Sequence, residues 1–398
     1  MRRFRLFLIS FAGFFLGVCI GYVFNYRLGN INFNPGYTSE VTGGATPSFG
    51  NSKREVFGFL PYWLLDKARE DYSGYVTTLN FFGLTIDNDG RIKKKTSPVE
   101  FEPGYYALTG GVAGKFLEAA KAHNIKLSLT AFSGDQEVIM ALIDEPISHA
   151  RNLVDDFAPF MNQFGFSDLN LDIEGVNTAS PEAQMKYIKF VAEVRNQMKA
   201  RNLGTLSIDL IPVDFVRDDH LAVPSALVGY VDKMILMAYD FHSFGSSVTG
   251  PVAPLYGTET VAEFDTNVAL SAALRSYPAQ KILLGIPSYG YTWETIGDFP
   301  RAATIPSSGL VKSVREVDGL LPSCQNCVRG FDKEAQEAYI IYKNETGTYQ
   351  QVFYPDARSF NAKLNYIIGN NLGGAAIWAL GYESNEDLNI IQTFLSNR

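Results

Sequence analysis

Strand-like apolar runs alternate with helix-like segments along most of this chain, and this alternation limits the fold more than any other feature. Eight short runs rich in Val, Ile, Leu and Phe have the length and composition of buried strands. Helical patterns separate them, as in βα repeats around a parallel sheet. The expected strands span residues 56–60, 78–86, 126–132, 168–173, 205–211, 233–238, 281–286 and 374–378. The expected helices span residues 114–123, 149–162, 183–201, 261–275 and 360–368.

Eight strands with intervening helices predict a (β/α)8 TIM barrel over residues 54–398. The pattern changes at about residues 292–354, where short β-like pieces at 338–342 and 350–354 lie around a pair of cysteines. We interpret this stretch as a small α+β insertion after the seventh strand. A doubly wound open sheet is the alternative fold. It would need a glycine-rich phosphate-binding turn after an early strand, and residues 58–63 contain aromatic side chains instead.

The helix expected over residues 183–201 has clear signals at its ends. The Ser180 hydroxyl can accept a hydrogen bond from the first turn, and Pro181 suits the first helical position. Glu182 lies beside the positive end of the helix dipole. Gly204 can end the helix. These signals predict a start close to residue 181.

The N-terminus has the pattern of a targeting segment. Three arginines among the first five residues precede an uncharged, mainly apolar run from Leu6 to Phe24, which is long enough to span a bilayer as a helix. Positive charge before such a run predicts that the rest of the chain lies outside the cytoplasm. We expect residues 1–27 to be an uncleaved membrane anchor, with a cleaved signal peptide and a secreted product as the alternative. Residues 28–53, rich in Gly, Asn, Ser and Thr, are expected to be a flexible linker.

Charge and composition exclude several classes of function. The formal net charge is −8, so nucleic acid is not an expected partner. The chain has four histidines, and none has metal-ligand spacing to another. We therefore expect no metal site and no cofactor.

Cys324 and Cys327 form a C-x-x-C pair within the expected insertion. In a chain exported from the cytoplasm, a small disulfide that closes a loop is the favoured interpretation. A redox site or half of a zinc site is the alternative.

The segment at 168–173 has a polar face with an unusual composition. Apolar residues at 169, 171 and 173 alternate with Asn170, Asp172 and Glu174. Side chains of a strand point to opposite faces with period two, so one amide and two carboxylates lie on the same face. Carboxylates so close together raise the proton affinity of one of them, which suits acid catalysis. The alternative is a half-exposed edge strand whose polar face meets water.

Acidic and aromatic residues gather at the ends of the expected strands. In a TIM barrel, catalytic groups lie at the carboxyl ends of the strands. An acidic centre surrounded by aromatic rings suits a carbohydrate site. The residues at these ends are Tyr62, Trp63, Asp172, Glu174, Met237, Tyr239, Asp240, His242, Tyr289, Trp293 and Trp378.

These motifs resemble glycoside hydrolase family 18, the chitinase-like family. The fourth strand of that family carries D-x-x-D-x-D-x-E, the sixth carries M-x-Y-D, and the eighth has a Trp after Gly-Gly. Here Asn170, Asp172 and Glu174 take the last three acidic positions of the first motif. The second motif matches at residues 237–240 and the third at residues 373–378, and residues 285–290 are similar to the family's seventh strand. The resemblance runs from about residue 56 to 382.

Two positions depart from the family pattern. Ser167 stands where the first Asp is expected, and Asn170 stands where the second is expected. In the family, the innermost Asp supports the next one through a shared proton or a hydrogen bond. The Asn170 amide can still donate a hydrogen bond, so we expect it to support Asp172. The N-x-D-x-E pattern resembles the branch of peptidoglycan and spore-cortex N-acetylglucosaminidases.

The resemblance implies retaining, substrate-assisted hydrolysis, an exception to the scheme with two enzyme carboxylates. Glu174 would be the general acid and base, and Asp172 would orient the acetamido group of the substrate. Tyr239 would donate a hydrogen bond to the acetamido oxygen. The remaining expected substrate-binding residues are Asn170, Met237, Asp240, Trp378, Tyr289 and Trp63.

The sequence thus predicts an exported glycosidase, anchored to the membrane, that hydrolyses β-linked N-acetylglucosamine polymers such as chitin or peptidoglycan glycan. One alternative is a catalytically silent, chitinase-like carbohydrate-binding protein, which Ser167 and Asn170 leave open; the retained Glu174 argues against it. Another is a barrel glycosidase of a different family, with two catalytic carboxylates on different strands.

Overall fold

The computed structural model describes residues 54–324 and 326–396. The expected anchor at 1–27 and the expected linker at 28–53 lie outside these residues. Within them, no helix combines the length and the apolar character that crossing a bilayer requires.

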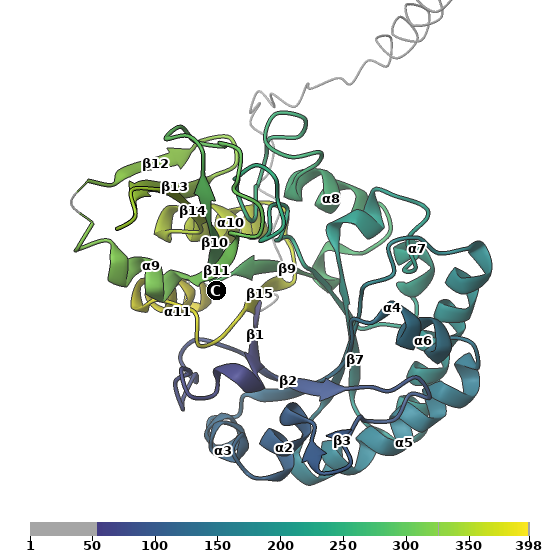
Figure 1. Cartoon of the computed structure of the whole chain (residues 1–398). Helices are drawn as coiled ribbons and strands as arrows, with labels where there is room; N and C mark the ends of the chain where they lie inside the picture. The colour runs from purple at the N-terminus through teal and green to yellow at the C-terminus, as the bar shows by residue number, and fades with distance from the viewer. Residues whose placement is uncertain (1–53, 325, 397–398) are drawn as a thin grey trace, which may run out of the picture. The chain divides into compact units, whose positions relative to one another are not determined.

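Eight parallel strands form a closed barrel in the order β1-β15-β9-β8-β7-β6-β5-β2 (Figure 1). The first strand pairs with both β2 and β15, so the sheet has no free edge. The TIM barrel prediction is therefore confirmed, and the open sheet is excluded. The barrel strands are β1 (Glu55–Pro61), β2 (Thr78–Thr85), β5 (Lys126–Ser133), β6 (Asp168–Ile173), β7 (Thr205–Leu210), β8 (Lys233–Leu236), β9 (Ile282–Pro287) and β15 (Gly374–Trp378).

Helices surround the outside of the barrel (Figure 1). All five expected helices are present, with ends that differ by a few residues. The α-helices are α2 (Pro103–Thr109), α3 (Gly114–Ala122), α4 (Gln136–Leu142), α5 (Pro146–Phe164), α6 (Pro181–Ala200), α7 (Pro224–Leu227), α8 (Thr266–Ala273), α9 (Val314–Leu320), α10 (Ala357–Gly369) and α11 (Asn385–Ser396). Short 3-10 helices lie at Tyr62–Leu64, Pro212–Phe215 and Ala279–Lys281, and a small hairpin is made by β3 (Lys95–Ser97) and β4 (Glu100–Phe101).

Local capping explains where two of these helices begin. Ser180 Oγ accepts a hydrogen bond from the Ala183 N–H at 3.2 Å, so α6 begins where its capping signals predicted. Helix α8 begins later than expected, at Thr266. Asp265 caps it through the Val268 N–H at 2.8 Å, and this carboxylate also binds the preceding loop at Thr258.

A small α+β insertion follows the seventh barrel strand, as predicted. Its antiparallel sheet has the order β11-β10-β14-β13-β12 and is accompanied by α9. The sheet begins slightly earlier than expected, because residues from Tyr289 onward already pair with β11. Cys324 and Cys327 form a disulfide just before β12. The strands are β10 (Tyr289–Thr295), β11 (Leu310–Ser313), β12 (Val328–Asp332), β13 (Glu337–Lys343) and β14 (Tyr349–Tyr354).

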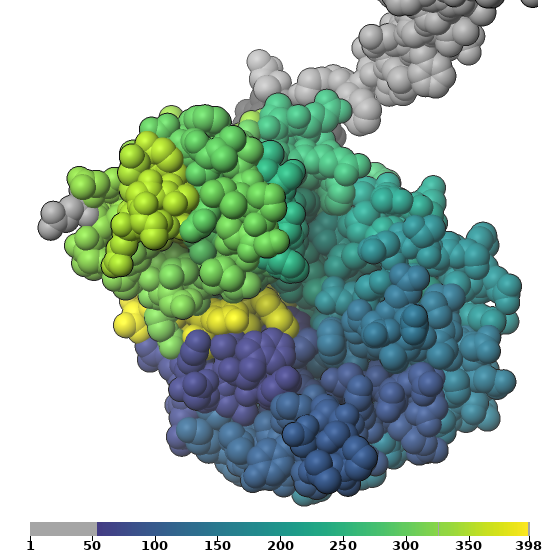
Figure 2. Space-filling view, viewed as in Figure 1, coloured from purple at the N-terminus to yellow at the C-terminus, as the bar shows by residue number. Residues whose placement is uncertain are grey.

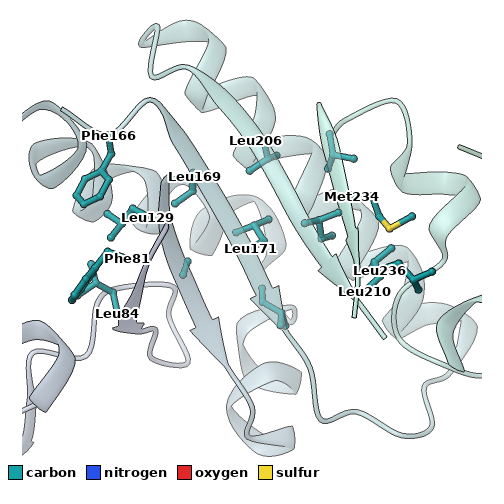
Figure 3. Packing of buried hydrophobic residues seen from close by; sticks show 14 of the residues in the cluster. Phe81, Leu84, Leu129, Phe166, Leu169, Leu171, Leu206, Leu210, Met234 and Leu236 are labelled. Atoms are coloured by element: carbon teal, nitrogen blue, oxygen red, sulfur yellow. The ribbon is translucent and has the colours of Figure 1, made fainter. Parts of the chain in front are cut away.

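The apolar face of β6 packs outward, toward the helices. Leu169 and Leu171 are completely buried in a core that also contains residues of α5 and α6. Figure 3 shows them between Leu129 of β5 and Leu206 of β7. Burial of each such leucine contributes roughly 2 kcal/mol. Every residue of β6 is buried and the strand lies between β5 and β7, so the edge-strand alternative is wrong. The polar face of β6 therefore points into the barrel.

Candidate active site

A cavity of about 350 Å³ opens at the carboxyl ends of the barrel strands. Figure 2 shows the surface hollowed where the purple, yellow, green and teal segments of the chain meet. Acidic groups lie on one side of the cavity, and aromatic rings form much of the rest. The lining residues are Tyr62, Trp63, Phe82, Gly83, Thr85, Phe132, Asp172, Glu174, Asp209, Ile211, Met237, Tyr239, Asp240 and Trp378.

Strand β6 brings Asp172 and Glu174 to this cavity. Asp172 is the last inward-pointing residue of the strand and is buried. Glu174 follows the strand directly, and its backbone N–H donates to the Ser133 carbonyl at 3.0 Å, so the end of β6 remains attached to β5. Burial raises the pKa of Asp172, and the nearby Glu174 and Asp209 raise it further.

Glu174 has the electrostatics of a general acid. Burial raises its pKa to about 7, and the charges of Asp240 and Asp214 act in the same direction. Asp214 is itself buried and pairs with His220, whose Nδ1 lies 3.1 Å from the carboxylate. A carboxyl group with a pKa near neutrality can hold a proton and release it during turnover.

The end of β8 positions Tyr239 and Asp240. A side chain at Gly285 of β9 would meet the Tyr239 ring at 2.9 Å, so this close approach requires glycine. Burial and the surrounding carboxylates hold the pKa of Tyr239 well above its usual value, and its hydroxyl therefore stays protonated as a hydrogen-bond donor. Asp240 Oδ1 accepts hydrogen bonds from the hydroxyls of Tyr289 at 2.5 Å and Tyr291 at 2.9 Å.

Aromatic rings that line the cavity form an aromatic wall, made of Tyr62, Trp63, Phe82, Phe132 and Trp378. Trp378 and Trp63 are the largest of these rings. Trp378, at the end of β15, packs edge-on against Phe82 at 4.8 Å and Phe59 at 5.4 Å between ring centroids. These contacts hold the indole in one orientation, and it remains only partly buried. Trp63 lies 6.2 Å from Trp378 and is 42% exposed. The two rings can offer flat apolar surfaces to a ligand.

Seven of the residues expected to act on or bind the substrate line this cavity, and two do not. Asn170 is completely buried inside the barrel, one inward position below Asp172. Tyr289 is almost fully buried, and its hydroxyl donates to the Asp240 carboxylate. Neither side chain therefore lines the cavity, and their contact with substrate stays a prediction. Trp293 is also buried, with its indole N–H donating to the Ser243 carbonyl at 3.1 Å, so it belongs to the core of the insertion.

The expected support of Asp172 by the Asn170 amide is wrong. The amide nitrogen of Asn170 donates to Ser207 Oγ at 3.2 Å and to Asp209 Oδ1 at 2.8 Å. Its oxygen lies 2.8 Å from the Thr130 hydroxyl. Both amide hydrogens are therefore used on the side of β7. The structure records no hydrogen bond between Asn170 and Asp172.

Asp209 is a lining residue that the sequence analysis missed. It is the last inward position of β7 and is buried beside the acidic end of β6. Burial raises its pKa, while the hydrogen bond from Asn170 acts in the opposite direction. The alternation of Thr205, Ser207 and Asp209 with apolar residues was the available signal, because it is the same pattern as in β6.

Among residues 54–324 and 326–396, no group of three or more His, Cys, Asp or Glu side chains is arranged to hold a metal ion.

An acidic strand end and an aromatic wall in one barrel cavity are typical of a carbohydrate-hydrolysing enzyme. Comparison with known families supports the same class. The model of the glycosyl hydrolases family 18 matches residues 59–383, and the chain belongs to this family. It is thus a glycoside hydrolase, and the family resemblance seen in its motifs is confirmed.

Curated relatives include bacterial sporulation proteins. The putative sporulation-specific glycosylase YdhD of Bacillus subtilis is 23% identical over 87% of this chain and 77% of its own length. The cortical fragment-lytic enzyme of the same organism is 28% identical over 63% of this chain, and the match spans only about half, 54%, of that protein. Among solved structures, the Cycas revoluta chitinase in complex with (GlcNAc)3 has a TM-score of 0.68 at 21% identity and covers 86% of this chain and 99% of that one.

Proposed function

We propose that this chain hydrolyses β-linked N-acetylglucosamine polymers with Glu174 as the catalytic acid and base. The observation that carries the proposal is the position of Glu174: it lies at the cavity with a pKa raised to about 7, beside Asp172 and Tyr239. This arrangement places a proton donor, a buried acid and a hydrogen-bond donor around one cavity, as acid-catalysed cleavage of a glycosidic bond requires.

The proposed reaction is retaining and substrate-assisted. Glu174 gives its proton to the glycosidic oxygen, and the bond from that oxygen to the anomeric carbon breaks. The acetamido oxygen of the same sugar forms a new bond to the anomeric carbon, so the enzyme needs no nucleophile. Water then attacks the anomeric carbon and loses a proton to the Glu174 carboxylate. This order restores both the acid and the acetamido group.

Asp172 and Tyr239 serve the acetamido group in this scheme. Positive charge develops on the acetamido group as the ring closes, and a carboxylate at Asp172 stabilises it. The Tyr239 hydroxyl, held in its protonated form, donates to the acetamido group. Trp378 and Trp63 form the floor and rim on which sugar rings stack, and Asp240 favours the protonated form of Glu174.

Chitin and the glycan strands of peptidoglycan are the proposed substrate classes. Both contain β-linked N-acetylglucosamine, which carries the required acetamido group. One similar structure is a chitinase solved with (GlcNAc)3, which supports an N-acetylglucosamine polymer as substrate, and one relative is a cortical fragment-lytic enzyme.

We further propose that the catalytic barrel acts outside the cytoplasm, attached by the apolar segment from Leu6 to Phe24. This part of the proposal rests on the sequence alone. Fractionation of cells that express the full chain tests it, since the protein should be found with membranes and be accessible to protease from outside.

The direct test is the release of reducing ends from chitin oligomers and from purified peptidoglycan, side by side. The wild type should cleave at least one of them, and Glu174→Gln should lower kcat by about 1000-fold because it removes the acid but keeps the shape of the side chain. Glu345→Gln, a change of an exposed glutamate in the insertion, is the matched control and should retain full activity. Tight binding of oligomers by the wild type without turnover would identify a silent carbohydrate-binding protein and refute the proposal.

A further inference from the structure

Asp172 lacks the hydrogen-bond partner that a buried carboxylate needs. Its Oδ1 is buried and has no partner among residues 54–324 and 326–396. The neighbour of Asp172 on β5 is Phe132, which offers no polar atom, and the Asn170 amide is directed to β7. An unpaired buried carboxylate is costly, and the other neighbouring strand, β7, offers a polar side chain that can pair with it.

The register between β6 and β7 places Asp209 in that position. Along the inward faces, Asp168 pairs with Thr205 and Asn170 pairs with Ser207. The next inward residues on the two strands are Asp172 and Asp209, and both line the cavity. On its other side, Asp209 has Ile235 of β8 as its neighbour. Each carboxyl group thus has an apolar neighbour on one side and the other carboxyl group on its second side.

Two adjacent buried carboxyl groups cannot both carry a charge at low cost. Their repulsion and their burial favour a state in which one proton is shared between them. The protonated carboxyl then donates a hydrogen bond to the ionised one. The Asn170 amide donates to Oδ1 of Asp209, so Oδ2 of Asp209 is the oxygen that remains available for a hydrogen bond with Asp172.

We propose that Asp209 is a positioning residue that shares one proton with Asp172 and so supplies the partner that Asp172 lacks. This inference rests on the proposed function and adds a residue to it. When positive charge develops on the acetamido group, the proton moves from Asp172 to Asp209, and Asp172 faces the substrate as a carboxylate. No bond to carbon changes in this step, and the proton returns to Asp172 after water has attacked.

Other titratable groups face this pair and contribute to its pH dependence. They come from β6 and the residue after it, from the end of β8, and from helix α6 outside the barrel. These groups are Asp168, Glu174, Tyr239 and Tyr187.

The kinetic test compares three variants of the full chain on the substrate that the wild type cleaves. Asp209→Asn should lower kcat by about 100-fold, because Asp172 then stays ionised through the cycle and no longer has an acceptor for its proton as charge develops; KM should change little, since the ground-state contacts of the sugar remain. The double variant Asn170→Asp/Asp209→Asn should recover most of this loss, because residue 170 is the next residue of β6 on the face that carries Asp172. Ser207→Ala is the matched control: it removes one acceptor of the Asn170 amide but no carboxyl group, and kcat should change only a few-fold. A folded Asp209→Asn protein with wild-type kcat, or a double variant no better than it, would overturn the inference.

A second measurement does not depend on turnover. Infrared spectroscopy follows the carbonyl band of protonated carboxylic acids as pH rises. In Asp209→Asn the pKa of Asp172 should fall, because a neighbouring negative charge is gone, and the band should disappear at lower pH than in the wild type. An unchanged titration would overturn the shared proton. If the band shifts in Asp209→Asn but the wild type cleaves no substrate, the proposed function is refuted and the carboxyl pair is not.

Discussion

At Glu174, burial and two neighbouring carboxylates act in the same direction, since all three favour the protonated carboxyl group. The proposed reaction needs that protonated form, which exists below the pKa and is lost as pH rises through it. The pH above which kcat falls is therefore set by the pKa of Glu174 and by the charges of its neighbours.

The pH profile of kcat tests this view of Glu174. With a pKa of about 7, kcat should fall about tenfold per pH unit at higher pH. Asp240→Asn removes a negative neighbour, so the pKa of Glu174 should fall and the alkaline limb should shift to lower pH. Glu345→Gln should leave the limb in place. A limb that does not move in Asp240→Asn would mean that another group limits the rate.

Tyr239→Phe separates the role of the hydroxyl from the packing of the ring. The phenylalanine ring can still lie against Gly285, while the donor to the acetamido group is gone. We expect kcat to fall by about 100-fold, the usual effect of losing one donor to developing charge. Thermal unfolding should stay close to that of the wild type, and a large loss of stability would indicate a structural role instead.

At the scale of single elements, the capping interaction at the start of α6 contributes to the free energy of unfolding. Ser180→Ala removes the acceptor for the Ala183 N–H and should lower the free energy of unfolding by about 1 kcal/mol. Ser180→Asp keeps an acceptor at the same place and should retain the stability, as urea denaturation can measure. Equal losses in both variants would mean that the serine matters for packing and not for capping.

Elements with strong local signals were predictable from the sequence, and elements that depend on distant pairing were not. Strands β6 and β15 have the expected bounds because apolar periodicity and flanking turns specify them locally. Strands β10, β11 and β12 were not predicted, since their antiparallel pairing joins segments whose own patterns are weak.

The same limit applies to the active site. The meeting of Asp172, Glu174 and Tyr239 at one cavity was predictable, because strand ends lie together at one end of a barrel. The sequence could not show which neighbouring strand the Asn170 amide would bind. It also could not show that Asp209 lies beside Asp172. Both facts follow from the register between β6 and β7, which only the three-dimensional structure gives.

At the scale of the whole molecule, one buried carboxylate joins the insertion to the barrel. Glu337 of β13 accepts hydrogen bonds from the backbone N–H groups of Val252 at 2.6 Å and Ala253 at 2.9 Å, in the loop after β8. Lys363 of α10 lies 3.9 Å from the same carboxylate, and both side chains are buried. Three segments that are distant in sequence therefore meet at this group.

Glu337→Gln should destabilise the protein markedly. The amide has only one oxygen to accept from the two N–H groups, and it leaves the buried Lys363 without an anionic partner. We expect a loss of about 3 kcal/mol in the free energy of unfolding, measured by urea denaturation. Glu345→Gln should change it by less than about 0.5 kcal/mol. Equal stability of the two variants would show that this ion pair does not hold the insertion.

If Glu174 drives hydrolysis through the acetamido group of the substrate, the first product must keep the configuration of the cleaved bond. Proton NMR recorded during cleavage of a chitin oligomer follows the anomeric signal of the newly released reducing end before mutarotation. We predict that the β-anomer appears first, and that no product forms from the fully deacetylated oligomer. An α-anomer formed first, or equal cleavage of the deacetylated oligomer, would contradict this mechanism.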